Sequence, residues 1–233
     1  MIVGENISPT SIVETARAQH CESISYTYTE PTIYFELAYD TARLAVEAGI
    51  KNVFVTNGYT TPEALKVIRP YLHAANIDLK GFSDEFYRRI CGARLQPVLD
   101  AIRLYREFGI WIEITTLVIP GHNDSDEQLT SIAQFIKSVD ESIPWHVSRF
   151  HPTYKLVDQP ITPLNTLEHA RKIGIDAGLL YVYEGNVPGQ GENTICPSCK
   201  QTIIRRIGFT VQESKMSDGL CGYCKTRIAG VWQ

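Results

Sequence analysis

Segments with strand character alternate with amphipathic helical segments along most of this chain of 233 residues. The strand segments are short and rich in β-branched and aromatic residues, whereas the helical segments repeat apolar residues every three or four positions. Strands that alternate with helices pair in parallel, through right-handed crossovers. The alternation therefore predicts an α/β fold, which we interpret as a partial β/α barrel with parallel strands.

The expected elements can be placed by their period and by the residues at their ends. Pro62 suits the first turn of a helix, and Gly49 and Gly109 suit positions just after a helix. Strands are expected over residues 22–28, 53–56, 75–79, 110–119, 145–150 and 179–183. Helices are expected over residues 9–18, 33–47, 62–68, 84–90, 95–108, 126–139 and 166–177.

Polar residues follow each of the first three expected strands. Glu30 stands before a proline after the first strand, Thr56 and Asn57 end the second, and Asp78 and Lys80 end the third. Any one of these groups could serve only as a cap or in a turn. In α/β folds, however, ligands bind at the carboxyl ends of the strands. The recurrence therefore favours a shared ligand site at this edge.

The charge and hydropathy of the chain limit its partners. A net charge of −4 argues against broad binding to nucleic acid, although the segment after residue 190 carries six basic and three acidic residues. The sequence contains no apolar run of the roughly 20 residues that a membrane span needs, and its N-terminus lacks the features of a signal peptide. We therefore expect a cytoplasmic protein without membrane contact.

Four cysteines near the C-terminus form two Cys-x-x-Cys motifs, Cys196 with Cys199 and Cys221 with Cys224. Each motif can place two thiolates on one ion, so the two motifs together predict a structural zinc ribbon. Two disulfides are disfavoured in a cytosolic chain, because its thiols stay reduced. An iron site with four cysteine ligands remains open. We expect a partial barrel over residues 1–190 and the ribbon over residues 191–233.

Several motifs, in the same order along the chain, resemble those of radical S-adenosylmethionine (SAM) enzymes. The chain is most similar to the branch near pyruvate formate-lyase activating enzyme that is called the AmmeMemoRadiSam system radical SAM enzyme. This resemblance implies a partial (β/α)6 barrel with SAM lying across the strand ends. The matching segments are residues 25–32, 55–58, 78–80, 118–124, 146–152 and 228–232.

The resemblance implies a role for each of the strand-end groups. Glu30 would meet the methionine amino group of SAM, and Thr56 and Asn57 would lie near its methionine and ribose. Asp78 and Lys80 would face the charged methionyl end. A zwitterion does need a carboxylate for its ammonium and a cation for its carboxylate, which Glu30 and Lys80 could supply. Alternatively, Glu30 and Lys80 form an ion pair with each other.

Two further positions follow from the same resemblance. His151 would approach the ribose or adenine, or else be an ordinary histidine beside Pro152. The family motif before the glutamate is Gly-Gly, whereas this chain has Tyr28 and Thr29 there. The chain therefore departs from the family at the part of the motif that makes the backbone contact.

The chain lacks the Cys-x-x-x-Cys-x-x-Cys motif that holds the family's [4Fe–4S] cluster. Cys21 and Cys91 are isolated, and we expect them to be small packed side chains. The similarity begins near Ile7, which in relatives follows the first strand and the cluster loop. We therefore expect either a truncated or misassigned start or, alternatively, a natural loss of the cluster, and an inactive chain as written.

By resemblance, the full-length enzyme is an oxidoreductase that cleaves SAM reductively to a 5′-deoxyadenosyl radical. That radical would abstract hydrogen from a protein or a small molecule, as in enzymes that activate glycyl-radical enzymes. A second hypothesis is a lyase in which Lys80 forms a Schiff base and Asp78 or Glu30 moves the proton. A third is a non-catalytic barrel whose ribbon docks an acidic partner or nucleic acid.

Overall fold

The computed structural model describes residues 7–208 and 210–232 of the chain. The chain forms two compact units. The first unit comprises Met1–Ile77 and Pro97–Ile112, and the second comprises Asp78–Gln96 and Glu113–Gln233. None of the helices in the described part of the chain combines the length and the apolar character needed to cross a membrane.

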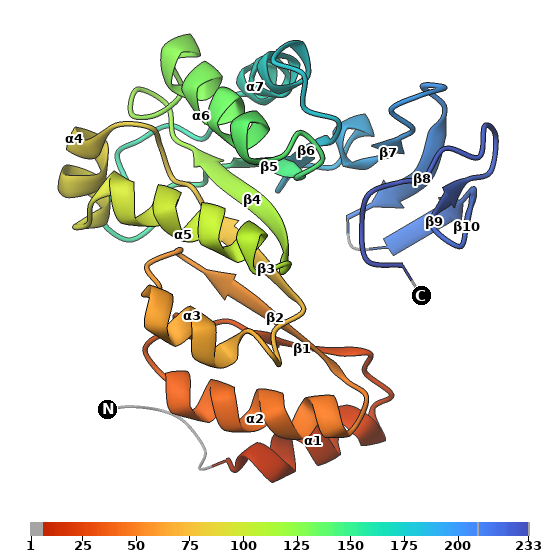
Figure 1. Cartoon of the computed structure of the whole chain (residues 1–233). Helices are drawn as coiled ribbons and strands as arrows, with labels where there is room; N and C mark the ends of the chain where they lie inside the picture. The colour runs from red at the N-terminus through yellow and green to blue at the C-terminus, as the bar shows by residue number, and fades with distance from the viewer. Residues whose placement is uncertain (1–6, 209, 233) are drawn as a thin grey trace. The chain divides into compact units, whose positions relative to one another are not determined.

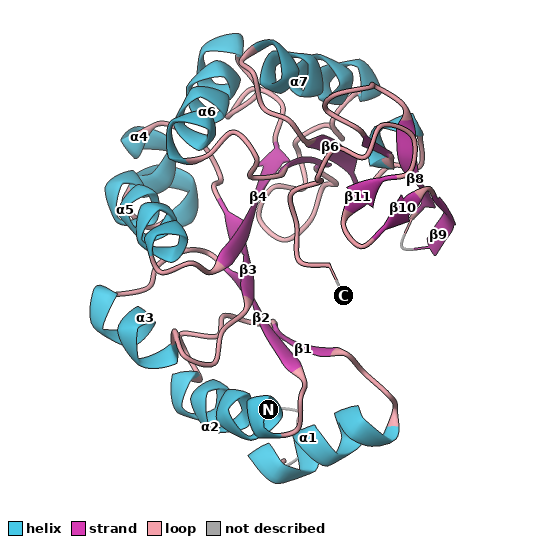
Figure 2. Cartoon of the chain, turned by 45° about the vertical axis from the view of Figure 1, so that its right-hand side comes forward, coloured by secondary structure: helices cyan, strands magenta, loops and turns pink. Residues whose placement is uncertain are grey.

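The first unit contains three parallel strands, in which β1 pairs with β2 and β2 with β3. Figures 1 and 2 show α1 and α2 packed side by side on the same side of β1 and β2. The strands are β1 (Ser23–Tyr26), β2 (Lys51–Thr56) and β3 (Ala74–Asp78). The helices are α1 (Pro9–Ala18), α2 (Phe35–Glu47), α3 (Pro62–Ile68) and most of α5 (Leu95–Glu107).

Local sequence explains how these elements begin and pack. The Ser8 side chain accepts a hydrogen bond from the Ser11 amide and so caps α1. Along β2, burial alternates, and Phe54 is fully buried against the helices. The buried Asn52 side chain accepts a hydrogen bond from the Tyr26 hydroxyl at 2.9 Å and donates to two main-chain carbonyls. The Asn52 amide thus finds local partners for its buried polar atoms and joins β2 to β1 and α2.

The second unit contains three further parallel strands, in which β4 pairs with β5 and β5 with β6. Figure 1 shows α6 and α7 together beside these strands, and both β5 and β6 contact α7. The strands are β4 (Trp111–Val118), β5 (Trp145–Arg149) and β6 (Val182–Gly185). The helices are α4 (Asp84–Phe86), the π-helix η1 (Tyr87–Cys91), α6 (Asp126–Val139) and α7 (Leu164–Asp176).

The C-terminal part of the second unit is a small all-β module that follows the 3-10 helix η2 (Gln190–Glu192). Strands β7, β8 and β9 form an antiparallel sheet, and β10 and β11 form a hairpin (Figure 2). The strands are β7 (Thr194–Ile195), β8 (Thr202–Ile207), β9 (Thr210–Ser214), β10 (Met216–Ser217) and β11 (Leu220–Cys221). The predicted domain boundary at residue 190 stays a prediction.

Six parallel strands with intervening helices confirm the expected α/β class. The last strand lies later than expected, at Val182–Gly185 rather than at 179–183. Leu179 instead closes α7, because its amide donates to the Gly174 carbonyl after Gly178 takes a φ of 99°. An apolar run at a helix end therefore resembled a strand in the sequence.

The expectation that Cys21 and Cys91 are packed side chains is wrong, because both are exposed. Cys21 lies in the turn between α1 and β1, and Cys91 ends η1 just before Gly92, which has a φ of 65°. A short side chain at a turn that ends a helix stays in solvent, even when its residue type is usually buried.

Candidate functional site

Glu30 is a buried carboxylate at the carboxyl end of β1, with only 6% of its surface exposed. Its Oε1 accepts a hydrogen bond from the Thr56 hydroxyl at 2.7 Å, and its Oε2 accepts one from the Asn57 amide at 2.8 Å. The Thr32 amide and hydroxyl donate to Oε1 at 3.3 and 3.1 Å. Within the described residues, all these donors are uncharged and Glu30 forms no ion pair. The structure thus brings three of the predicted site residues together.

The turn after β2 places the Asn57 amide for this contact. Gly58 has a φ of 77°, and its amide donates to the Thr56 hydroxyl at 3.1 Å. A Cβ at position 58 would lie 2.9 Å from Cγ2 of Ile77, so only glycine fits without a shift of the strand. The Asn57 side chain accepts a hydrogen bond from the Tyr59 amide, which closes the turn.

Tyr28 and Thr29 occupy the positions where the resembling family has glycines. Tyr28 has a φ of 39°, in the left-handed region that glycine favours, and its side chain is 92% exposed. The backbone here therefore keeps a glycine-type conformation although the residue is a tyrosine.

In the second unit, the Lys80 ammonium lies 2.6 Å from Oδ2 of Asp78. Both side chains are partly exposed, so this ion pair is accessible to a ligand. The Lys80 amide donates to the hydroxyl of Tyr87 at 3.0 Å. Burial raises the pKa of Tyr87 well above its usual value, which keeps this phenol neutral. The structure thus pairs Lys80 with Asp78.

Asn123 fixes the segment that carries Lys80, and the sequence analysis gave it no role. The fully buried side chain donates to the Lys80 carbonyl at 2.6 Å and to the Leu117 carbonyl at 2.8 Å. Its Oδ1 accepts a hydrogen bond from the Ile119 amide at 2.6 Å. It therefore ties the turn after β4 to the chain that follows β3. Its place in the Pro-Gly-His-Asn-Asp turn after a strand was the signal that could have found it.

Replacing Asn123 by alanine should lower the free energy of unfolding by about 2–4 kcal/mol, because three backbone groups, one buried and two partly buried, lose their partner. Urea unfolding followed by circular dichroism would measure the change. Asn165→Ala, at an exposed position near the start of α7, is the matched control and should change stability by no more than about 0.5 kcal/mol. A loss below about 1 kcal/mol for Asn123→Ala would contradict this role.

His151 lies exposed on the loop after β5, so its proposed contact with ribose or adenine stays a prediction. The loop is anchored beside it, since the Phe150 amide donates to the Thr162 hydroxyl at 2.9 Å. His146, in the same motif, is the better-held histidine. Its Nε2 lies 2.6 Å from Oε2 of Glu113, and its ring stacks on Tyr183 with centroids 5.2 Å apart.

The four cysteines of the C-terminal module converge on one point. The sulfur atoms of Cys196 and Cys224 are 3.6 Å apart, those of Cys199 and Cys221 are 3.7 Å apart, and all four lie within 4.8 Å of one another. Two thiolates bound tetrahedrally to one ion at about 2.3 Å would be about 3.8 Å apart. The spacing therefore fits a single ion and is far longer than the roughly 2.05 Å of a disulfide bond.

The electrostatics of these thiols also favour a bound cation. Hydrogen bonding with Thr226 lowers the pKa of Cys224 to about 6. The Gln201 amide acts in the same direction on Cys199, but burial and the neighbouring thiols outweigh it and raise the pKa of Cys199 to about 12. Four thiols so close cannot all ionise alone, whereas a divalent cation at their centre would stabilise four thiolates.

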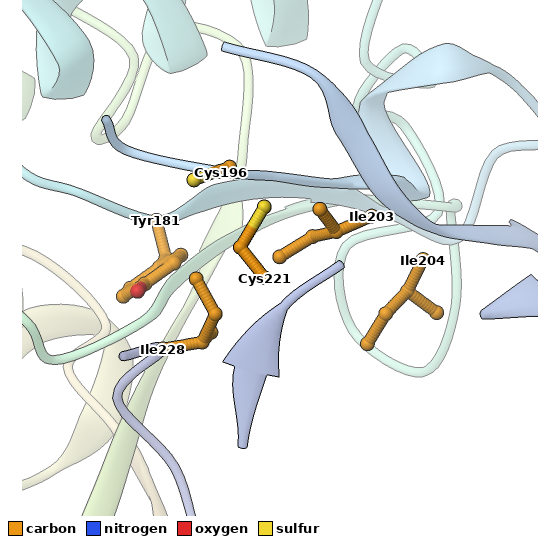
Figure 3. Packing of buried hydrophobic residues seen from close by; sticks show 6 residues of the cluster. All are labelled: Tyr181, Cys196, Ile203, Ile204, Cys221 and Ile228. Carbon is orange, nitrogen blue, oxygen red and sulfur yellow. The ribbon is translucent and has the colours of Figure 1, made fainter. Parts of the chain in front are cut away.

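The ribbon core extends beyond the cysteines (Figure 3). Cys196 and Cys221 pack with Ile203, Ile228 and, from the segment before β6, Tyr181. The Tyr181 hydroxyl accepts a hydrogen bond from the Ala229 amide at 3.3 Å. The C-terminal module therefore shares a core residue with the chain that enters the last parallel strand.

Comparisons with known proteins agree with this geometry. Residues 2–133 match the family model described as the radical SAM superfamily. The uncharacterized protein MJ0808 of Methanocaldococcus jannaschii is 48% identical over 208 residues, which are 88% of this chain and 62% of that protein. The isethionate sulfite-lyase activating enzyme of Nitratidesulfovibrio vulgaris is 26% identical over 124 residues, which are 51% of this chain and 39% of that enzyme. The chain thus spans less than two thirds of the length of these relatives.

A solved structure shows the same fold. A domain of pyruvate-formate lyase-activating enzyme from Bacteroides vulgatus matches with a TM-score of 0.61 at 18% identity, over 70% of this chain and 98% of that domain. The match confirms the expected α/β fold of the partial (β/α)6 barrel type and the similarity to an activating enzyme.

Proposed function

The chain belongs to the radical SAM superfamily, and we propose that its strand-end residues bind the methionyl part of S-adenosylmethionine for a radical enzyme reaction. The observation that carries this proposal is the buried Glu30 carboxylate, which among the described residues contacts only uncharged donors. Three of its four donors are on Oε1, whereas Oε2 accepts only the Asn57 amide within the described part of the chain. Oε2 can therefore accept a further, charge-assisted hydrogen bond from a cation. The amino group of SAM is a cation of suitable size.

The groups around Glu30 support the same reading. Thr56 and the Asn57 amide fix both carboxylate oxygens, so the side chain needs no reorganisation to receive an ammonium. Lys80 stays the predicted cation for the methionyl carboxylate, and within the second unit its ammonium pairs with Asp78. We favour SAM binding over the lyase, because the family model that matches this chain is that of the radical SAM superfamily.

The [4Fe–4S] cluster of radical SAM enzymes supplies the electron that cleaves SAM, and the residues present here do not fit that cluster. Among the described residues, the ribbon cysteines are the only group of three or more side chains able to hold a metal, and their spacing fits one ion. Cys21 and Cys91 are isolated and exposed. We therefore assign the strand-end residues to SAM recognition and no step to a cluster within residues 1–233.

Activating enzymes among the similar proteins support a substrate that is itself a protein, from which hydrogen would be abstracted. A small-molecule substrate remains the alternative. For the ribbon we propose a structural zinc ion, because four thiolates leave no open coordination position for catalysis.

Isothermal titration calorimetry with SAM tests the proposal. Glu30→Gln should weaken binding by about 1–3 kcal/mol, because the variant loses a charge-assisted hydrogen bond to the ligand ammonium. Lys80→Met should weaken it by a similar amount at the ligand carboxylate. Glu36→Gln, at an exposed position in the first turn of α2, is the matched control and should leave the affinity unchanged. Equal affinities in the parent chain, Glu30→Gln and Lys80→Met would refute the site.

A further inference from the structure

A cavity of about 350 Å³ lies within the second unit. One wall is the turn that carries the first Cys-x-x-Cys motif (residues 196–199), which we call the first knuckle, and the other is the segment that joins α7 to β6. We call this cavity the knuckle pocket. Its walls come from Arg171, Ile175 and Leu180 on the helical side and from Ile195, Pro197 and Lys200 on the ribbon side. All of its lining residues belong to the second unit, and none of them is a proposed SAM ligand. The pocket is therefore a separate feature of the fold.

The body of the knuckle pocket is apolar. Ile175 and Leu180 line it and remain 46% and 37% exposed, so apolar surface stands open to water at a concave site. Covering such surface with a hydrocarbon group is favourable, and concave apolar sites of about 300–1,000 Å³ are typical of small-molecule binding. The volume is at the small end of that range, which suits a ligand with one or two rings.

The knuckle pocket is lined by two basic side chains and by Cys196, whose thiolate charge a bound cation would partly neutralise. The basic side chains are Arg171 and Lys200, and no carboxylate from the described residues lines the pocket. The Arg171 Nε donates to the Val182 carbonyl at 3.1 Å, which fixes its guanidinium, and Arg171 also lowers the pKa of the nearby Glu184 against the effect of burial. Lys200 takes part in no ion pair within the described chain, so its ammonium is the uncompensated charge.

The turn after the first Cys-x-x-Cys motif fixes the backbone of Lys200. Its amide donates to the Cys196 carbonyl at 3.0 Å, and its φ of 59° turns the chain sharply after the second cysteine of the motif. The lysine is thus fixed by the same turn that presents two metal ligands. A charge anchored on a short rigid turn loses less conformational entropy on binding than one on a mobile loop.

The geometry points to a binding site for a small amphipathic carboxylate in the knuckle pocket. The hydrocarbon body of the ligand lies against Ile175 and Leu180, and its carboxylate meets Lys200 and Arg171. This inference does not rest on SAM binding, and it makes the ribbon part of a ligand site as well as a proposed metal site.

The test uses the metal-loaded full chain and two probes that differ only in charge, naphthalene-2-carboxylate and the neutral naphthalene-2-methanol. Ligand-observed NMR titrations would give both affinities. The carboxylate should bind about five-fold more tightly than the alcohol, as expected for one partly exposed charge contact. Lys200→Gln should reduce this difference, because only Arg171 then remains to meet the carboxylate, and Lys66→Gln, at an exposed position of α3, should preserve it.

Ile175→Trp tests the location of the site, because the larger side chain should fill the cavity and block both probes. Ile175 is half exposed on α7, so the variant should still fold, which its circular dichroism spectrum would verify. The proposal is overturned if the carboxylate does not bind at its solubility limit, if both probes bind equally to the parent chain, or if folded Ile175→Trp binds them unchanged.

Discussion

Cys199→Ser should unfold residues 191–233 and release the metal, while the parallel strands of both units stay folded. Structural zinc sites contribute about 10–16 kcal/mol of apparent folding free energy in small domains, and the short strands β7, β10 and β11 cannot replace that contribution. Elemental analysis should find about one zinc per parent chain and none in the variant. Hydrogen exchange should show loss of amide protection across β8, with protection retained in β2.

The shared core predicts how far the damage spreads. Tyr181 packs in the ribbon core, so amides at the start of β6 should also lose protection, although less than those of β8. Cys21→Ser is the matched control, because that cysteine is exposed and isolated, and it should retain both metal and protection. A ribbon that stays folded without metal would refute the role of the ion. If elemental analysis finds one iron per chain instead of zinc, the four cysteines form an iron site.

The proximity of the strand-end residues and of the four cysteines could be predicted, because both depend on short sequence patterns with regular geometry. The carboxyl ends of parallel strands fall on one edge, so Glu30 and Thr56, 26 residues apart, could be expected to lie close together. The two Cys-x-x-Cys motifs likewise predicted a single site, which the sulfur positions fit. In both cases the regular geometry of a strand or a knuckle converts sequence spacing into spatial proximity.

Contacts between distant segments could not be predicted in this way. Asn123 donates to the Lys80 carbonyl, a partner 43 residues away that no period or motif reveals. The Asp78–Lys80 pair depends on side-chain conformations, which the sequence does not fix at a strand end. The knuckle pocket exists only where the ribbon meets the segment before β6, so its lining comes from two regions that the sequence analysis treated as separate domains.

Residues 1–233, reconstituted anaerobically with iron and sulfide and reduced with dithionite, should form no 5′-deoxyadenosine from SAM. A [4Fe–4S] cluster needs at least three thiolates that converge beside the co-substrate, and loss of that ligand set removes the reaction rather than slowing it. The described residues bring three or more cysteines together only in the ribbon, whose sulfur atoms are 3.6 and 3.7 Å apart in pairs. That spacing suits a single ion and is too short for thiolates on separate irons of a cluster.

Two further samples test this expectation, an extended chain and a variant without Cys21 and Cys91. A chain extended at its N-terminus by a segment with Cys-x-x-x-Cys-x-x-Cys should gain both the cluster absorption and 5′-deoxyadenosine, measured by liquid chromatography. In that extended chain, Glu30→Gln should reduce the product, because the variant weakens the hold on the SAM ammonium before any electron transfer can occur. If residues 1–233 alone turn over with Cys21 and Cys91 both replaced by alanine, the ribbon cysteines must hold the reactive centre. The inference from the sulfur spacing to a single structural ion would then be wrong. The assignment of SAM recognition to Glu30 and of a purely structural role to the ribbon would be wrong as well.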